Sequence, residues 1–219
     1  MKNLLFVMLL SFCGSVVFAQ EVKVQYFKDR FCSKETSESK ANFVQTTTTF
    51  SEGGYMKSVT RVSDNKIISA EGYKNDEPIG KWVIERGSGY AELDYNFEMG
   101  KEVDICDGKS DVDSGANVDD DSLGLKVEGY DSFNEYLWKN VFYPWLAREN
   151  GQMGTVYLNI LVNATGEIEQ VALQKSSGYK SLDKEAMRVT RGIPISRVDY
   201  VKRFGKRACF RFPMKFSLR

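Results

Sequence analysis

An alternation of apolar and polar side chains, interrupted only by Leu161, runs through residues 156–163, VYLNILVN. Successive side chains of a strand point to opposite faces, so the pattern predicts a strand with one apolar face. That face would carry Val156, Leu158, Ile160 and Val162, and the other Tyr157, Asn159, Leu161 and Asn163. The turn-forming NATG follows, with Gly166 at a position where turns favour glycine. The segment therefore predicts the first strand and the turn of an antiparallel hairpin.

The returning strand of this hairpin is irregular. Ile168 is out of phase with Val171 and Leu173 in a simple two-residue repeat. A β-bulge near Glu169–Gln170 would turn all three side chains to the apolar face.

Helices are predicted on both sides of the hairpin. Ser132 to Glu135 has the capping-box pattern that opens a helix. Pro144 fits the start of a second, short helix, and Gly151 fits its end. Ser181 is predicted to cap a third helix. Its buried stripe would be Leu182, Ala186 and Val189.

The final segment, RACFRFPMKFSL, alternates again. One face would carry Ala208, Phe210, Phe212, Met214 and Phe216, and the other Arg207, Cys209, Arg211, Pro213 and Lys215. Proline is accepted in a strand at an edge or a bulge. Pro213 therefore predicts that the last strand lies at the edge of a sheet.

The N-terminal half is predicted to be an antiparallel β meander at 20–101. Strand-like segments at 43–50, 55–62, 66–73, 81–85 and 91–97 are separated by turn-forming residues. Trp82 is expected in the core of a hairpin there.

Residues 102–131 hold ten acidic and two basic side chains, which predicts a solvated linker. Asp111 and Asp113 within it lack the spacing of an EF-hand calcium loop.

Residues 1–19 have the features of a signal peptide. Lys2 precedes the apolar run Leu4 to Phe12, and Val17-Phe18-Ala19 fits a cleavage site after Ala19. We therefore expect export to the periplasm. The alternative is an uncleaved anchor that holds the protein in the inner membrane, facing the periplasm.

The composition argues against an enzyme and against a metal site. The chain has no histidine, so the commonest general base and the commonest metal ligand are missing. We expect no catalytic residue, no metal and no cofactor. A hydrolase that uses Asp119 and Asp121 is the alternative, and it is disfavoured because both lie in a polar run without fixed surroundings.

The two halves carry opposite charge. Residues 20–131 hold 14 basic and 23 acidic side chains, a net charge of −9, and residues 132–219 hold 15 and 7, a net charge of +8. In an exported protein the basic half is expected to meet acidic protein segments or anionic lipid headgroups rather than nucleic acid. Cys32 and Cys106 are a candidate disulfide, and the alternative is that the three cysteines of the exported chain stay unpaired.

Residues 131–219 resemble the C-terminal domain of the energy transducer TonB and its periplasmic relatives. Five elements agree in order: the Tyr-Pro helix, the glycine-bounded hairpin, SSG, LDKEA and a proline-containing last strand ending in FSLR. The matching residues include Tyr143, Pro144, Gly151, Gly154, Gly166, Ser177, Gly178 and Leu182.

The sequence as a whole predicts an α+β chain with two domains, and the resemblance covers only the second of them. Its C-terminal two-layer domain, 132–219, would have a three-stranded antiparallel sheet with helices on one face, and the β-rich meander would precede it. The family binds a short peptide, the TonB box of an outer-membrane transporter, by adding it as a strand to the last strand. Carried over, the binding residues would be Arg207, Ala208, Cys209, Phe210, Arg211 and Phe212, with the basic side chains favouring an acidic peptide.

Three readings of this domain remain. The first is a periplasmic protein that binds envelope proteins such as TonB-dependent transporters. The second is a membrane-anchored energy transducer, although the chain lacks the proline-rich spacer that such a transducer needs. The third is a homodimer formed through the last strand.

Overall fold

The computed structural model describes residues 19–106, 127–165, 167–193 and 207–218. These residues divide into two compact units, one of residues 19–75 and 81–92 and the other of residues 76–80 and 93–218. The predicted signal peptide, except for Ala19, lies outside the described residues. So do the aspartates from 111 to 121, Gly166 and Pro194.

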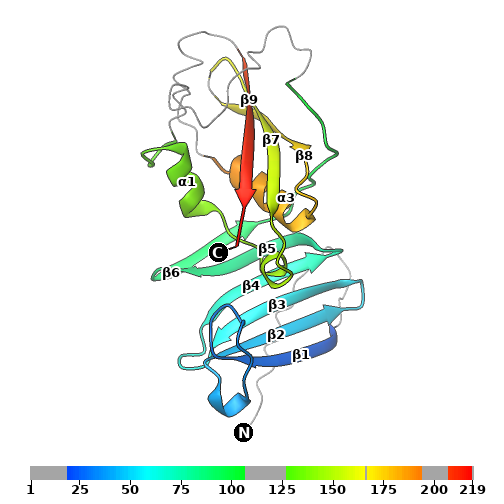
Figure 1. The fold of residues 1–219 in the computed structure, drawn as a ribbon, viewed down its shortest axis with the longest axis vertical. Helices are drawn as coiled ribbons and strands as arrows, with labels where there is room; N and C mark the ends of the chain where they lie inside the picture. Colours follow the sequence, from blue (N-terminus) through cyan, green and yellow to red (C-terminus); the bar gives the residue numbers. More distant parts are fainter. Residues whose placement is uncertain (1–18, 107–126, 166, 194–206, 219) are drawn as a thin grey trace. The chain divides into compact units, whose positions relative to one another are not determined.

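The first unit is built on a six-stranded antiparallel sheet in the order β1-β2-β3-β4-β5-β6, drawn from blue to green in Figure 1. The strands are β1 (Ala19–Phe27), β2 (Phe43–Phe50), β3 (Gly54–Arg61), β4 (Ile67–Lys74), β5 (Glu77–Arg86) and β6 (Gly89–Asp94). Each strand pairs with the next one along the chain, so the predicted meander is confirmed. Strand β1, AQEVKVQYF, was not predicted.

Short turns let consecutive strands pair directly. Asn75 and Asp76, between β4 and β5, both have a positive φ, 51° and 62°. Asparagine and aspartate tolerate this conformation better than most residues. Beyond the turn, Trp82 is fully buried, its Nε1 donates to the carbonyl oxygen of Gly72, and its ring lies 5.0 Å from that of Tyr73. Trp82 is thus a core residue, as predicted.

The second unit has the predicted α+β fold. Its sheet has the order β8-β7-β9, and β7 pairs antiparallel with both neighbours. The elements are α1 (Phe133–Asn140), α2 (Trp145–Glu149), β7 (Gly154–Val162), β8 (Ile168–Lys175), α3 (Lys180–Arg191) and β9 (Ala208–Phe216). The helix α3 therefore carries the chain across the sheet, so that β9 lies beside β7 rather than beside β8.

The main core of this unit lies between one face of the sheet and the helices. The predicted apolar faces of β7 and β9 are both buried in it, together with Phe133 and Leu137 of α1 and Leu182 of α3. Ile168, Val171 and Leu173 of β8 join the same core. The register between β7 and β8 shifts where Leu161 pairs with Gln170 and Val162 with Ile168. Glu169 is left over as the bulge that the sequence predicted.

Helix boundaries follow the capping signals with one exception. Ser132 caps α1 by accepting from the backbone N–H of Glu135, Pro144 immediately precedes α2, and Gly151 ends that helix with φ of +62°. The prediction that Ser181 caps α3 is wrong. The helix begins at Lys180, and Ser181 is a buried residue of its first turn.

Candidate functional site

Strand β9 forms one edge of the three-stranded sheet. It pairs with β7 along its whole length, with Phe212 opposite Leu158 and Arg211 opposite Asn159. The described residues place no strand on its other side, and Figure 1 shows β9 (red) with β7 beside it and β8 beyond. The expected edge position of the last strand is therefore confirmed.

The opposite edge of the sheet, along β8, is covered by the chain that enters the domain. The backbone N–H of Val103 donates to the carbonyl oxygen of Leu173 at 2.8 Å, and Glu102 accepts from the N–H of Ser176 at 3.1 Å. Of the two edges, β9 is thus the better candidate for binding another strand.

The contact between Val103 and Leu173 also shows how the backbone of β9 is oriented. It requires the carbonyl of Leu173 to point away from β7, and backbone groups of successive residues in an antiparallel ladder point to alternate sides. Leu158, opposite Leu173, then directs its own groups toward Phe212. It follows that Cys209, Arg211 and Pro213 direct their backbone groups to the outer side of β9, the side away from β7.

The side chains of the six predicted binding residues lie on two faces. Ala208, Phe210 and Phe212 are buried in the main core. Arg207, Cys209 and Arg211 lie on the opposite face of the sheet, which we call the outer face. Only backbone groups and outer-face side chains of β9 are therefore placed to meet a partner.

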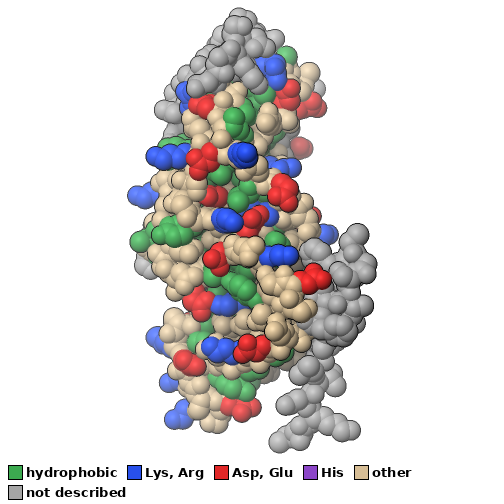
Figure 2. Space-filling view, turned by 90° about the vertical axis from the view of Figure 1, so that its right-hand side faces the viewer, with side chains coloured by type: hydrophobic (Ala, Val, Ile, Leu, Met, Phe, Trp, Pro, Cys, Tyr) green, Lys and Arg blue, Asp and Glu red, His purple; other side chains and the backbone are tan. Residues whose placement is uncertain are grey.

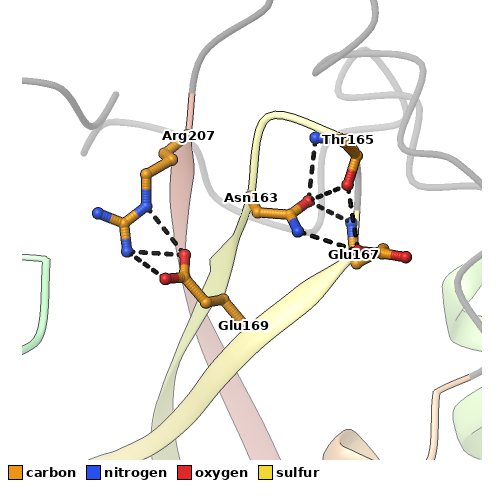
Figure 3. Close-up of polar contacts among 5 residues, drawn as sticks. All are labelled: Asn163, Thr165, Glu167, Glu169 and Arg207. Carbon is orange, nitrogen blue, oxygen red and sulfur yellow. Dashed lines mark hydrogen bonds and ion pairs between the residues drawn. The ribbon is translucent and has the colours of Figure 1, made fainter.

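The arginines of this strand face carboxylates of their own domain. Figure 3 shows Arg207 with the carboxylate of the bulge residue Glu169, at 2.7 Å, beside the turn in which Asn163 Oδ1 accepts from the backbone N–H of Thr165 and Glu167. The second arginine, Arg211, donates to Asp104 at 3.1 Å.

The basic side chains of the last strand were expected to favour an acidic peptide. That expectation rested on the positive side chains of the strand alone, whereas their acidic partners come from segments distant in sequence. Figure 2 shows the same mixture more widely, with basic and acidic side chains interspersed over the face in view.

Asp104 joins all three strands of the sheet. Its Oδ1 accepts from Asn159 of β7 at 2.7 Å, and its Oδ2 accepts from Gln174 of β8 at 2.8 Å and from Arg211 of β9. Burial would raise the pKa of Asp104. Hydrogen bonds from the Cys106 N–H, Arg211 and Gln174 outweigh it and hold this pKa below its ordinary value. Asp104 is therefore a charged anchor between the entering chain and the outer face.

The disulfide of the domain joins Cys106 to Cys209, with their Cα atoms 5.6 Å apart. The predicted pairing of Cys32 with Cys106 is wrong. It rested on closeness in sequence, whereas Cys106 and Cys209 are 103 residues apart and meet because β9 returns beside the entering chain. Both half-cystines are buried in a small apolar cluster with Ile105, Leu161 and Ala172.

We call residues 101–106 the clamp. The sequence predicted that a solvated linker begins at residue 102. Instead, Glu102, Val103 and Asp104 contact β8, and the disulfide joins Cys106 to β9. The apolar residues Val103 and Ile105 in an otherwise acidic run were the sequence signal for this packing.

The residues that define the family resemblance have structural roles in this unit. A Cβ at Gly154 would stand 3.0 Å from the Cβ and the carbonyl oxygen of Ser177, so the start of β7 and the Ser-Ser-Gly turn touch. Asp183 of α3 fixes that turn, because Oδ1 accepts from the N–H and the hydroxyl of Ser177, both at 2.8 Å. Gly178, next in the chain, has φ of +93°.

The Tyr-Pro pair connects α2 to the sheet. The hydroxyl of Tyr143 donates to the carbonyl oxygen of Gln152, and its ring packs edge-on against Phe216 of β9 at 5.7 Å. Pro144 holds the extended backbone from which α2 begins. Leu182, the last of the matching residues, is fully buried.

The sequence did not reveal that one carboxylate on α3 is buried. Glu185 is 0% exposed. It accepts from the hydroxyl of Tyr95 at 2.5 Å, from the N–H of Phe142 at 2.6 Å and from the guanidinium of Arg188 at 2.7 Å. The spacing of Glu185 and Arg188 was visible in the sequence, but their burial was not.

Among the described residues, no helix is both long enough and apolar enough to cross a membrane. The same part of the chain holds no group of three or more cysteine or acidic side chains that could bind a metal ion.

Comparison with known proteins matches the second unit. Residues 139–218 match the family model described as the Gram-negative bacterial TonB protein C-terminal. Protein TonB of Neisseria meningitidis serogroup C is 34% identical over 76 residues, which are 35% of this chain and 25% of that protein. Protein TonB of Neisseria gonorrhoeae is 33% identical over 76 residues, 35% of this chain and 24% of that protein.

The matched region spans about a quarter of these curated relatives. No solved structure matches the chain. The family match covers α2, α3 and the complete sheet, together with the end of α1. Residues 139–218 of this chain therefore form a domain of the TonB C-terminal family.

Proposed function

We propose that this protein acts at the cell envelope, and that its TonB-like domain binds extended peptide segments of outer-membrane transporters along the outer side of β9. The observation that carries the proposal is the position of β9 as the sheet edge opposite the clamp-covered edge of β8. An incoming peptide would pair with the side of β9 to which Cys209 and Arg211 direct their backbone groups.

The proposed stretch is Arg207, Ala208, Cys209, Phe210, Arg211 and Phe212. Pro213 limits it, because proline has no N–H to donate to an added strand. Since Ala208, Phe210 and Phe212 are buried beneath the sheet, they would support β9 rather than contact the peptide.

The partner need not be acidic. Arg207 and Arg211 already face Glu169 and Asp104. Backbone pairing would therefore supply most of the affinity, and side chains of the peptide over the outer face would supply selectivity. The relatives named Protein TonB support transporters of the outer membrane as the class of partner.

The proposal is tested with peptides tiled from the periplasmic N-terminal segments of outer-membrane transporters of the source organism. Binding to the whole protein is measured by fluorescence anisotropy. At least one peptide should bind, and replacing alternate residues of that peptide by proline should abolish binding because the added strand loses its donors.

A pair of protein variants separates backbone pairing from charge. Arg211→Ala loses the contact with Asp104 but keeps the N–H, whereas Arg211→Pro loses both. If β9 is the binding edge, Arg211→Pro should bind the peptide more weakly than Arg211→Ala. Equal binding by the two variants, or no binding of any tiled peptide by the native protein, would contradict the proposal.

Membrane-anchored energy transduction is the second candidate function, and the curated relatives favour it by name. Mass spectrometry of the N-terminus of the protein isolated from cells distinguishes the two. A chain that begins at Gln20 supports the periplasmic binder, and a chain that keeps Met1 to Ala19 supports the anchored transducer.

A further inference from the structure

The clamp makes contact with every strand of the TonB-like sheet. Val103 bonds to the backbone of β8, Asp104 reaches side chains on all three strands, and Cys106 is covalently joined to β9. Ile105 packs with Leu161 and Ala172 on the outer face. Where Ile105 packs, the outer face is thus a second, small apolar core rather than a solvated surface.

The attachment to β9 falls on the proposed binding edge itself. Cys209 directs its backbone groups to the outer side of β9 while its side chain is bonded to Cys106. Two residues later, Arg211 has the same orientation and is tied to Asp104. Cys209 and Arg211, the two residues of β9 before Pro213 whose backbone groups point outward, are therefore both fixed by the clamp.

We propose that the clamp positions β9 for peptide binding, and that binding along this edge requires the Cys106–Cys209 disulfide. This inference rests on the proposed function. Edge strands are held by one neighbour only, so their ends fray and their register can slip. A strand that is fixed at Cys209 and Arg211 is already in the conformation that an added strand needs.

The clamp also directs the peptide to one edge. Val103 occupies the β8 side at Leu173, so an added strand would have to displace it there. At β9 the clamp contacts the side chains of Cys209 and Arg211. The backbone groups of these residues are still directed away from β7, toward the side where an added strand would lie. The same segment would thereby exclude one edge and prepare the other.

Reduction of the disulfide is a defined chemical step. One thiolate of a dithiol attacks Cys106 Sγ or Cys209 Sγ and forms a mixed disulfide, and the second thiol of the dithiol then displaces the protein sulfur. The dithiol supplies two electrons and two protons, leaves as a cyclic disulfide, and Cys106 and Cys209 become thiols. In an oxidising envelope the bonded form is expected to persist.

The test uses the whole protein and the tightest-binding transporter peptide from the tiled set. Its dissociation constant is measured for the oxidised protein, for the protein reduced with a dithiol and for the double variant Cys106→Ser, Cys209→Ser. We expect affinity at least about tenfold weaker without the disulfide, because β9 would be in the competent conformation for about a tenth of the time. The matched control is Cys32→Ser, which should bind like the native protein.

Hydrogen exchange read by mass spectrometry shows whether the effect is local. Because the disulfide also stabilises the domain as a whole, all elements should lose some protection without it, but the amides of β9 should lose more than those of β7 and α3. An equal loss of protection in all elements would be explained by the lower stability of the domain alone, and the positioning role would then be overturned. Equal peptide affinity in the oxidised and reduced protein would overturn it as well.

The variant Asp104→Asn tests the clamp independently of the disulfide, because it keeps the disulfide and weakens the interaction of residue 104 with Arg211. It should lower peptide affinity by less than reduction does. Failure of the oxidised native protein to bind any peptide would refute the proposed function, whereas binding that is insensitive to reduction would refute the clamp alone.

Discussion

Gly154 and Ser177 lie so close that a Cβ at position 154 would stand 3.0 Å from both the Cβ and the carbonyl oxygen of Ser177, and Ser177 would have to shift by a few tenths of an ångström to admit it. This contact holds the start of β7 against the turn before α3. Ser177 cannot retreat easily, because its N–H and hydroxyl are both bonded to Asp183.

The first prediction is that Gly154→Ala destabilises the domain by about 1–3 kcal/mol, the usual cost of overpacking a fixed site. Urea denaturation measures it. The control is Gly89→Ala at the start of β6, where a Cβ would meet no atom within 4 Å. A Gly154→Ala protein as stable as the Gly89→Ala protein would show that the turn moves freely.

A second prediction concerns the buried carboxylate. Glu185→Ala removes the buried carboxylate that pairs with the largely buried guanidinium of Arg188 and accepts from the hydroxyl of Tyr95. Removing one partner of a buried ion pair costs about 3–5 kcal/mol. Thermal unfolding should show a large fall in the melting temperature, whereas Glu98→Gln, at an exposed position of the same unit, should leave it unchanged. Similar melting temperatures for the two variants would contradict a structural role for Glu185.

Acid stability should depend on Asp104. Its pKa in the folded protein lies below the ordinary value of 3.8, so the folded state binds the proton less tightly than the unfolded state. The resulting stabilisation is fully present above pH 3.8 and is lost as the pH falls through the folded-state pKa. Urea denaturation of the native protein across this range should show the loss. Asp104→Asn should be less stable at neutral pH and should lose less on acidification, and parallel curves for the two proteins would refute the assignment.

The disulfide should contribute strongly to stability. In the chain-entropy account, a crosslink that closes a loop of about 100 residues stabilises the folded state by about 4–5 kcal/mol. Denaturation with and without a dithiol measures the difference in unfolding free energy. Cys106→Ser should reproduce the reduced value, and Cys32→Ser should remain sensitive to the dithiol. A Cys32→Ser protein that no longer responds would point to a different pairing.

Features encoded by neighbouring residues were predictable from the sequence. The alternation in β7 and β9, the bulge at Glu169 and the helix signals at Pro144 and Gly151 each depend on a few adjacent residues, and the structure has them all. Strand β1 was missed although Val22, Val24 and Tyr26 alternate with Glu21, Lys23 and Gln25, the pattern of a strand with one apolar face.

Contacts between distant segments were not predictable from spacing. Cys106 meets Cys209, Asp104 meets Arg211 and Glu169 meets Arg207 only because the sheet order brings β9 back beside β7. Charge counting assigned the arginines to an external partner, since the sequence alone does not reveal which carboxylates face them. The edge position of the last strand could be predicted, but the clamp that covers the outer face could not.

The Cys106–Cys209 bond has a mechanical consequence. If β9 captures a peptide as proposed, a tension on this strand can pass through one sulfur–sulfur bond to Cys106, in the chain that enters the domain. The helices and the hairpin between these two residues then lie outside the load path. Such a domain could transmit a pull along its edge strand without having to withstand that pull through its hydrophobic core.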